Sequence, residues 1–229
     1  MANPVRSSQT LPDLADVGGV YRTQQAAVAD ELRRLILTGQ LVPGTRLLQA
    51  AIAEGMHTST TPVREAMRQL IAEGLLDADA HRGAVVHAPT TAELEEIYSM
   101  RMLLEPLSIV RTVRMITPDE LAECDKVLAR MEAEQDIVVW VNLNREFHAV
   151  LGRAARSPIL HAVLTNLRDR SAPYVAMWIQ MANRIPVGNQ EHRALLDACR
   201  NRDEASAVET VKLHFEATPH LAEPLKPGG

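Results

Sequence analysis

Hydrophobic residues recur with a helical period along most of the chain, which predicts a mainly α-helical protein. The first such stretch begins at Thr23 and ends at Gly39, a residue type that commonly terminates helices. Its apolar positions fall on one side of a helix and are Val28, Leu32, Leu35 and Ile36. After a turn at residues 41–45, the pattern predicts a second, short helix over residues 49–54.

The stretch from Thr58 to Gly74 predicts a third helix with two different faces. One face is apolar and consists of Val63, Met67, Leu70 and Ile71. The opposite face begins with hydroxyl groups and continues with Arg64 and Arg68. Because hydroxyl and guanidinium groups reach phosphates and base edges in the DNA major groove, we expect this to be a recognition helix.

Two short apolar runs at residues 75–76 and 84–86 flank a polar tip, and this arrangement predicts a β-hairpin. Three short helices followed by a hairpin are typical of a winged helix-turn-helix, here over residues 21–88. Residues 1–20 precede this domain and mix Pro, Ser, Asn and Asp, which offer little apolar surface. We expect them to form a disordered arm.

A second series of amphipathic helices occupies residues 90–220 and predicts an antiparallel bundle of about six helices, followed by a flexible tail at residues 221–229. Thr90 with Glu93 has the spacing of a capping box that opens the first of them, and Thr117 with Glu120 repeats it. The residues expected to open later helices are Asp136, Ser157, Asn189 and Asp203. The residues that the first helix should bury are Leu94, Ile97, Leu104, Leu107 and Val110.

The chain has 229 residues, 46% of them hydrophobic, which is enough for two domains that each bury a core. Its formal charge of −5 excludes a generally basic nucleic-acid coat, so any DNA contact must come from a local surface. Cys124 and Cys199 lack metal-type spacing and are expected to be reduced core residues. No run approaches the roughly 20 apolar residues of a membrane span, so we expect a cytoplasmic protein.

Four polar residues lie on the inward stripes of three predicted bundle helices, and they are Asn144, His148, His192 and His214. A buried imidazole or amide without a partner costs about 1–3 kcal/mol, so several in one core need a shared partner. A divalent metal ion would satisfy them together, with zinc favoured and nickel or manganese as alternatives.

These neutral ligands would leave the charge of a divalent ion uncompensated, which predicts an anionic effector such as a small organic acid. Arg101, on the first bundle helix, is the candidate effector-binding residue, because it could bind a second carboxylate of such an acid. It could equally form an i,i+4 salt bridge to Glu105. The sequence leaves both interpretations open.

The N-terminal domain resembles that of GntR-family transcription regulators in four ordered motifs, at residues 41–47, 61–67, 73–76 and 82–86. The resemblance implies DNA contacts by Ser59, Thr61, Arg64, His81, Arg82 and Gly83, the last three in the minor groove. Thr60 and Arg68 belong to the same predicted contact surface. The family usually has arginine where Thr60 stands, so we expect the operator contact to differ there.

The second domain resembles the all-helical effector (FCD) domain of the FadR-type branch of the GntR family, in residues 144–151, residues 191–193 and the terminal His214. In that branch this pattern marks a metal site, which implies the same four ligands that the helix stripes suggest. The position of Asn144 is more often aspartate in the family. The whole resemblance covers residues 23–219.

We expect a DNA-binding transcription regulator, a repressor, that is homodimeric through its bundle and recognises a short palindrome in double-stranded operator DNA. Two alternatives are a hydrolase-like metalloenzyme and a direct sensor of the metal ion. The enzyme is the weaker alternative, because helical geometry is expected to point Glu146 and Glu191 away from the histidines, which leaves no general base. We therefore expect a protein that is not an enzyme.

Overall fold

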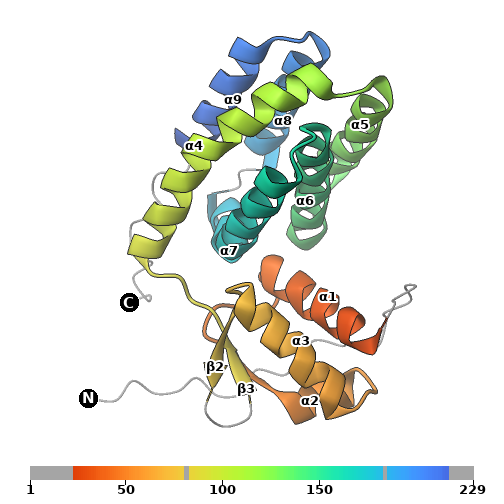
Figure 1. The fold of residues 1–229 in the computed structure, drawn as a ribbon, viewed down its shortest axis with the longest axis vertical. Helices are drawn as coiled ribbons and strands as arrows, with labels where there is room; N and C mark the ends of the chain where they lie inside the picture. Colours follow the sequence, from red (N-terminus) through yellow and green to blue (C-terminus); the bar gives the residue numbers. More distant parts are fainter. Residues whose placement is uncertain (1–22, 80–82, 183–184, 217–229) are drawn as a thin grey trace. The chain divides into compact units, whose positions relative to one another are not determined.

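The computed structural model describes residues 23–79, 83–182 and 185–216 (Figure 1). The chain divides into two compact units, Met1–Ala88 and Pro89–Gly229. The arm expected at residues 1–20 and the tail expected at residues 221–229 lie outside the described residues. In its described part the first unit combines helices with a small sheet, and the second unit is helical.

Along the described part of the first unit the order of elements is α1 (Gln24–Leu37), β1 (Arg46–Leu48), α2 (Gln49–Gly55), α3 (Thr60–Ala72), β2 (Leu76–Asp79) and β3 (Gly83–Val86). The strands form an antiparallel sheet in the order β1-β3-β2, with Val85 of β3 opposite both Arg46 and Asp77. The predicted winged helix-turn-helix is therefore confirmed, with β1 as a third strand beside the hairpin.

Local signals set the limits of α1 and α3. Thr23 Oγ1 accepts a hydrogen bond from the Ala26 backbone N–H (3.1 Å) and caps the start of α1. Gly39 and Gly74 follow the two helices with φ angles of 74° and 76°, which a residue with a side chain rarely adopts. The predicted apolar face of α1 is buried, as are Val63, Met67 and Leu70 of α3, whereas Ile71 is only partly buried. The two helices pack against each other.

In the described part of the second unit six helices follow one another, namely α4 (Thr91–Met115), α5 (Pro118–Ala133), α6 (Ile137–Ala154), α7 (Pro158–Ala182), α8 (Ile185–Arg200) and α9 (Glu204–Glu216). The predicted helical bundle is confirmed (Figure 1). Both capping boxes form, at Thr90 with Glu93 and at Thr117 with Glu120. None of the helices in the described part combines the length and the apolar content that a membrane span requires.

The bundle has a continuous apolar core that includes the fully buried rings of Trp140 and Phe147. Cys124 and Cys199 lie in this core as free thiols, as predicted. Burial raises the pKa of Cys124 to about 12 and that of Cys199 to about 11, which keeps both thiols protonated.

The inner face of α4 differs from the prediction. Leu107, expected to be buried, is 54% exposed, whereas Arg101 and Glu105 are 8% and 7% exposed. Ser108 and Thr112 continue this buried polar face toward the end of the helix. Leu94 and Ile97 are buried as predicted. In the middle of the helix, however, the side that carries Arg101, Glu105 and Ser108 lines the cavity, and Leu107 lies on the side that faces solvent.

The role predicted for Asn189 is also wrong. α8 begins at Ile185, one turn earlier than expected, so Asn189 lies within the helix. Its side chain is buried, accepts a hydrogen bond from Trp140 Nε1 (2.9 Å) and donates one to the Met131 backbone oxygen (3.3 Å). A tertiary contact to the core therefore replaces the local capping bond that its residue type suggests.

Candidate functional site

The outer face of α3 carries the side chains predicted to contact DNA. Ser59 is the N-cap residue of α3, and it and the four predicted helix residues Thr60, Thr61, Arg64 and Arg68 are all exposed. Glu65 lies between the arginines and forms ion pairs with both, at 3.5 Å to Arg64 Nε and 3.1 Å to Arg68 Nη1. Exposed pairs of this kind contribute little stability, so phosphates can replace them at low cost.

Two of the three predicted minor-groove residues, His81 and Arg82, lie outside the described residues. Gly83, the third, is the first residue of β3. A Cβ atom at Gly83 would come within 2.5 Å of the Leu47 backbone oxygen in β1. The sheet therefore requires glycine at this position whether or not it contacts DNA.

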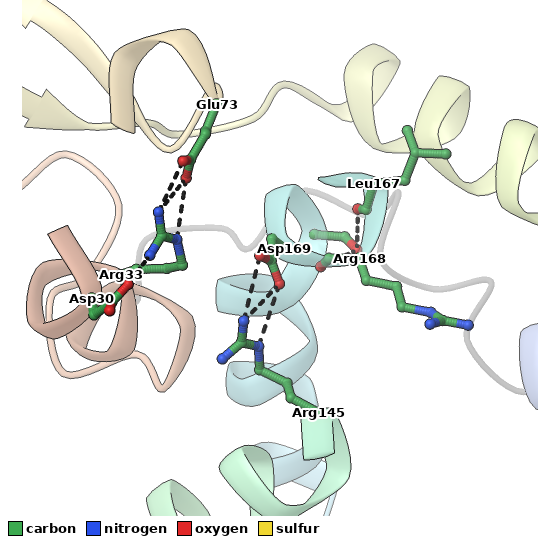
Figure 2. Close-up of polar contacts among 8 residues, drawn as sticks. Asp30, Arg33, Glu73, Arg145, Leu167, Arg168 and Asp169 are labelled. Atoms are coloured by element: carbon green, nitrogen blue, oxygen red, sulfur yellow. Dashed lines mark hydrogen bonds and ion pairs between the residues drawn. The ribbon is translucent and has the colours of Figure 1, made fainter. Parts of the chain in front are cut away.

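An ion pair joins α1 to the C-terminal end of α3 (Figure 2). Arg33 of α1 forms a bidentate contact with Glu73 at the end of α3, with Nε–Oε2 and Nη2–Oε1 distances of 3.1 and 2.8 Å. Asp30 holds the same guanidinium group at 2.6 Å. This partly buried pair fixes the orientation of the recognition helix relative to its scaffold.

The three predicted histidine ligands come together from different helices of the second unit. His148 of α6 and His192 of α8 have their Nε2 atoms 3.2 Å apart. The ring centroid of His214, on α9, lies 6.5 Å from that of His148 and 6.0 Å from that of His192. Asn144 lies one turn before His148, and its Oδ1 atom is buried without a hydrogen-bond partner among the residues that the structure describes.

The two close imidazoles are neutral. Burial lowers the pKa of His148 well below its usual value, and nearby Arg168 adds to the shift. Burial also lowers the pKa of His192 to about 3, and His214 adds to it. Neutral imidazole is the form that binds metal ions, so the rings are in the correct protonation state for that role.

Over the described residues, no group of three or more histidine, cysteine or carboxylate side chains is arranged to hold a metal ion. Binding would therefore require His214 to approach the Nε2 pair of the other two histidines. The chemistry of the donors nevertheless fits a divalent ion, since it combines neutral imidazoles with a buried amide oxygen that lacks a partner.

Glu191 is placed differently from the prediction. It lines the cavity, and its Oε2 atom lies 2.6 Å from His214 Nδ1. A carboxylate in contact with the second nitrogen of a histidine fixes the ring orientation and directs the first nitrogen toward a metal. The prediction failed because Glu191 lies next to His192 at the edge of the inner face of α8.

A buried cluster of charges lies beside the histidines. Glu105 of α4 contacts two arginines: Arg168 of α7, whose Nε is 2.9 Å from Oε1, and Arg101, whose Nε is 3.3 Å from the same oxygen. Arg101 also donates to Ser171 Oγ (3.2 Å) and lies over the ring of Phe215 at 4.8 Å. The cluster therefore contains two positive charges and one negative charge.

The pairing of Arg101 with Glu105 is one of the two alternatives that the sequence left open. Arg168 was missed, although it lies four residues after Leu164, on a predicted apolar stripe, and a charge at such a position was the available signal. Burial by itself would raise the pKa of Glu105, but Arg168 and Arg101 outweigh it and lower that pKa. Glu105 is therefore ionised.

The histidines and this charge cluster border a cavity with two compartments. The larger has a volume of about 150 Å³ and the smaller about 40 Å³. His148, His214, Arg101 and Arg168 line both compartments, Asn144 lines the larger, and His192 lines the smaller. The predicted metal ligands and Arg101 therefore surround one site.

Each of the two units matches a known protein family. Residues 24–86 match the bacterial regulatory proteins of the gntR family, and residues 96–217 match the FCD domain. The chain belongs to the GntR family. It is a DNA-binding transcription regulator of that family, which consists of regulators and not of enzymes.

Relatives of this GntR-family regulator match over most of their length. The transcriptional regulator YdhC of Bacillus subtilis is 27% identical over 202 residues, 86% of this chain and 88% of YdhC. The galactonate operon transcriptional repressor of Escherichia coli is 27% identical over 216 residues, 84% of this chain and 94% of the repressor. The solved structure of E. coli McbR has the same fold, with a TM-score of 0.80, 24% identity, and coverage of 88% of this chain and 98% of McbR.

Proposed function

We propose that this GntR-family regulator is a repressor controlled by a small carboxylate that binds at a divalent metal ion in the helical unit. The observation that carries the proposal is the convergence of His148, His192 and His214 on one cavity, beside an Asn144 oxygen that has no hydrogen-bond partner in the described part of the chain. The relationship to the galactonate operon transcriptional repressor supports repression.

Each of the four residues would contribute one ligand atom to the ion. His148 and His192 would contribute Nε2 atoms, Asn144 its Oδ1 atom, and His214 the third imidazole, oriented by Glu191. The bound ion would supply a concentrated positive charge that attracts a carboxylate. Arg101 and Arg168, with one carboxylate between them, add to the positive potential on the same cavity.

Operator binding tests the proposal. The DNA duplex for this test is one that the parent protein enriches from a random library. The affinity of the protein for this duplex should fall by about 5–150-fold when a carboxylate that it binds and one equivalent of zinc are present, which is the usual range of allosteric coupling. Arg64→Ala should weaken binding to the same duplex by about 10–100-fold, because Arg64 is exposed on α3 and an arginine contact to a base is worth about 1–3 kcal/mol. Fluorescence anisotropy measures both effects.

Arg130→Ala is the matched control, since Arg130 is an exposed arginine on α5 with one ion-pair partner, Glu146. It should leave the affinity for the duplex unchanged. If no mono- or dicarboxylate changed either the duplex affinity or the melting temperature, the carboxylate effector would be wrong. Equal losses in Arg64→Ala and Arg130→Ala would rule out α3 as the recognition helix.

We also propose that the regulator is a homodimer through α4 and α7. The outward side of α4 carries Leu103 and Leu107, which are 77% and 54% exposed, and α7 carries Ile159 and Val163, which are 81% and 42% exposed. The two helices pack against each other in the bundle. Exposed apolar side chains on adjoining helices support an interface between copies of this chain, and two copies suit a palindromic operator.

Leu103→Glu should convert the dimer to a monomer, because it replaces an exposed apolar side chain of the proposed interface with a charge, at a cost of about 2 kcal/mol or more. Sedimentation velocity at micromolar concentration measures the change. Leu213→Glu is the control, since Leu213 is 52% exposed on α9 and should tolerate the charge. A dimer that survived Leu103→Glu would place the interface elsewhere.

A further inference from the structure

Most of the exposed surface of the larger compartment is hydrocarbon, although Tyr98, Arg145, Thr165 and Asp169 also line it. Among the described residues its lining includes Val141, Ala172, Val175 and Ile179 and the rings of Trp140 and Phe215. The basic and imidazole groups named above are gathered where the two compartments meet, since they line both. A ligand that filled this space would have one end among positive or metal-binding groups and the other end against hydrocarbon.

Several polar groups on this wall are already bound to other parts of the protein. Trp140 Nε1 donates to Asn189 Oδ1 (2.9 Å), so the indole offers only its hydrocarbon surface. Arg145 binds Asp169 with an Nη2–Oδ1 distance of 3.1 Å, as Figure 2 shows. A ligand hydroxyl that faced the hydrocarbon part of this wall would give up its hydrogen bonds to water without an equal replacement, at a cost of about 1–3 kcal/mol for each hydroxyl.

The volume of the compartment limits the apolar part of a ligand. An apolar cavity of about 150 Å³ engineered into another protein binds benzene, and the larger compartment has a volume of about 150 Å³. A body of about six carbon atoms therefore fits this space. Acetate would leave most of this space empty.

We propose that the effector is a monocarboxylate with a compact apolar body of about six carbon atoms, such as a ring, and neither a polyhydroxy acid nor a short dicarboxylate. This inference rests on the proposed function, in which a carboxylate binds beside the histidines. The carboxylate faces His148, His214 and Arg101, and the body occupies the apolar compartment. The second carboxylate of a dicarboxylate would be desolvated wherever it faced the apolar side chains of this compartment.

Isothermal titration of the full chain, with and without one equivalent of zinc, tests this assignment. The ligands are benzoate and cyclohexanecarboxylate against acetate, gluconate and succinate. We expect the two ring acids to bind at least about tenfold more tightly than the other three, since even one buried methylene group contributes about that factor. If gluconate or succinate bound more tightly than the ring acids, the proposed apolar monocarboxylate would be wrong, whereas the proposal of a carboxylate effector would still hold. If none of the five acids bound, the proposed function itself would fail.

Ala172→Leu fills the apolar compartment from its wall and should weaken benzoate binding by about tenfold or more, while acetate binding changes by less than about twofold. Ala129→Leu is the matched control, because Ala129 is an exposed alanine on α5 that does not line the cavity. If Ala172→Leu lowered the melting temperature, Val175→Thr would make the same wall polar at nearly constant volume and should also weaken benzoate binding. Unchanged benzoate affinity in a folded Ala172→Leu or Val175→Thr variant would overturn the assignment.

Discussion

Replacing Glu105 with glutamine should lower the free energy of unfolding of the helical unit by about 3–5 kcal/mol near neutral pH, the usual cost of breaking a buried ion pair. Glu105 is 7% exposed and is the carboxylate that Arg101 and Arg168 share, so the substitution leaves the buried Arg101 and the partly buried Arg168 without this counter-charge. Both tryptophans of the chain, Trp140 and Trp178, belong to this unit. Their fluorescence in a urea titration therefore measures its unfolding.

Lowering the pH should reduce the difference in the free energy of unfolding between the parent protein and Glu105→Gln. The two arginines lower the pKa of folded Glu105 below its usual value of 4.5, against the opposing effect of burial. The stability contributed by the ionised form is therefore present above that value and is lost as the pH falls through the lower pKa of the folded state. Glu96→Gln, an exposed position on the same helix, should change stability by less than about 0.5 kcal/mol. Equal effects of the two substitutions would contradict the role of the buried cluster.

His148→Ala should reduce the metal content from about one equivalent per chain to a small fraction of it, because structural and regulatory metal sites depend on each of their few ligands. His214→Ala should do the same if the third imidazole completes the site. Elemental mass spectrometry measures the content, on protein purified without a nickel column and incubated with zinc. Chelation should lower the melting temperature of the parent and leave that of both variants unchanged.

His87→Ala is the control for this experiment, since His87 belongs to the DNA-binding unit and contacts Asp77. It should retain the full metal content. A parent protein without metal, even after incubation with zinc, would contradict the metal proposal. The effector would then be held by hydrogen bonds to the same histidines.

The helices and the winged helix-turn-helix could be predicted because their determinants are local. Val63, Met67 and Leu70 recur at the helical period, and Gly74 adopts the left-handed conformation that ends α3. The capping boxes likewise depend on residues three positions apart. The same periodicity identified the three histidines on inward faces, since a polar residue on an apolar stripe is visible in the sequence.

The pairing of side chains in the candidate site could not be predicted. Arg168 and Glu105 are 63 residues apart in the sequence, and Asn189 and Trp140 are 49 residues apart, so no local sequence pattern indicates either contact. Leu107 was expected to be buried because the spacing of apolar residues distinguishes the two faces of a helix. That spacing does not indicate which of the two faces lines a cavity with charged side chains. Only the packing of α4 against α7 and α9 decides that point.

α4 presents different chemistry on its two sides, with Arg101 and Glu105 toward the cavity and Leu103 and Leu107 toward solvent. Its 25 residues extend for about 38 Å, and they begin at Thr91, shortly after the DNA-binding unit ends at Ala88. Pro106 interrupts this helix after Arg101 and Glu105. In the proposed function, a displacement imposed by an acid beside Arg101 would therefore reach the first turn of α4 through a helical segment that contains no proline.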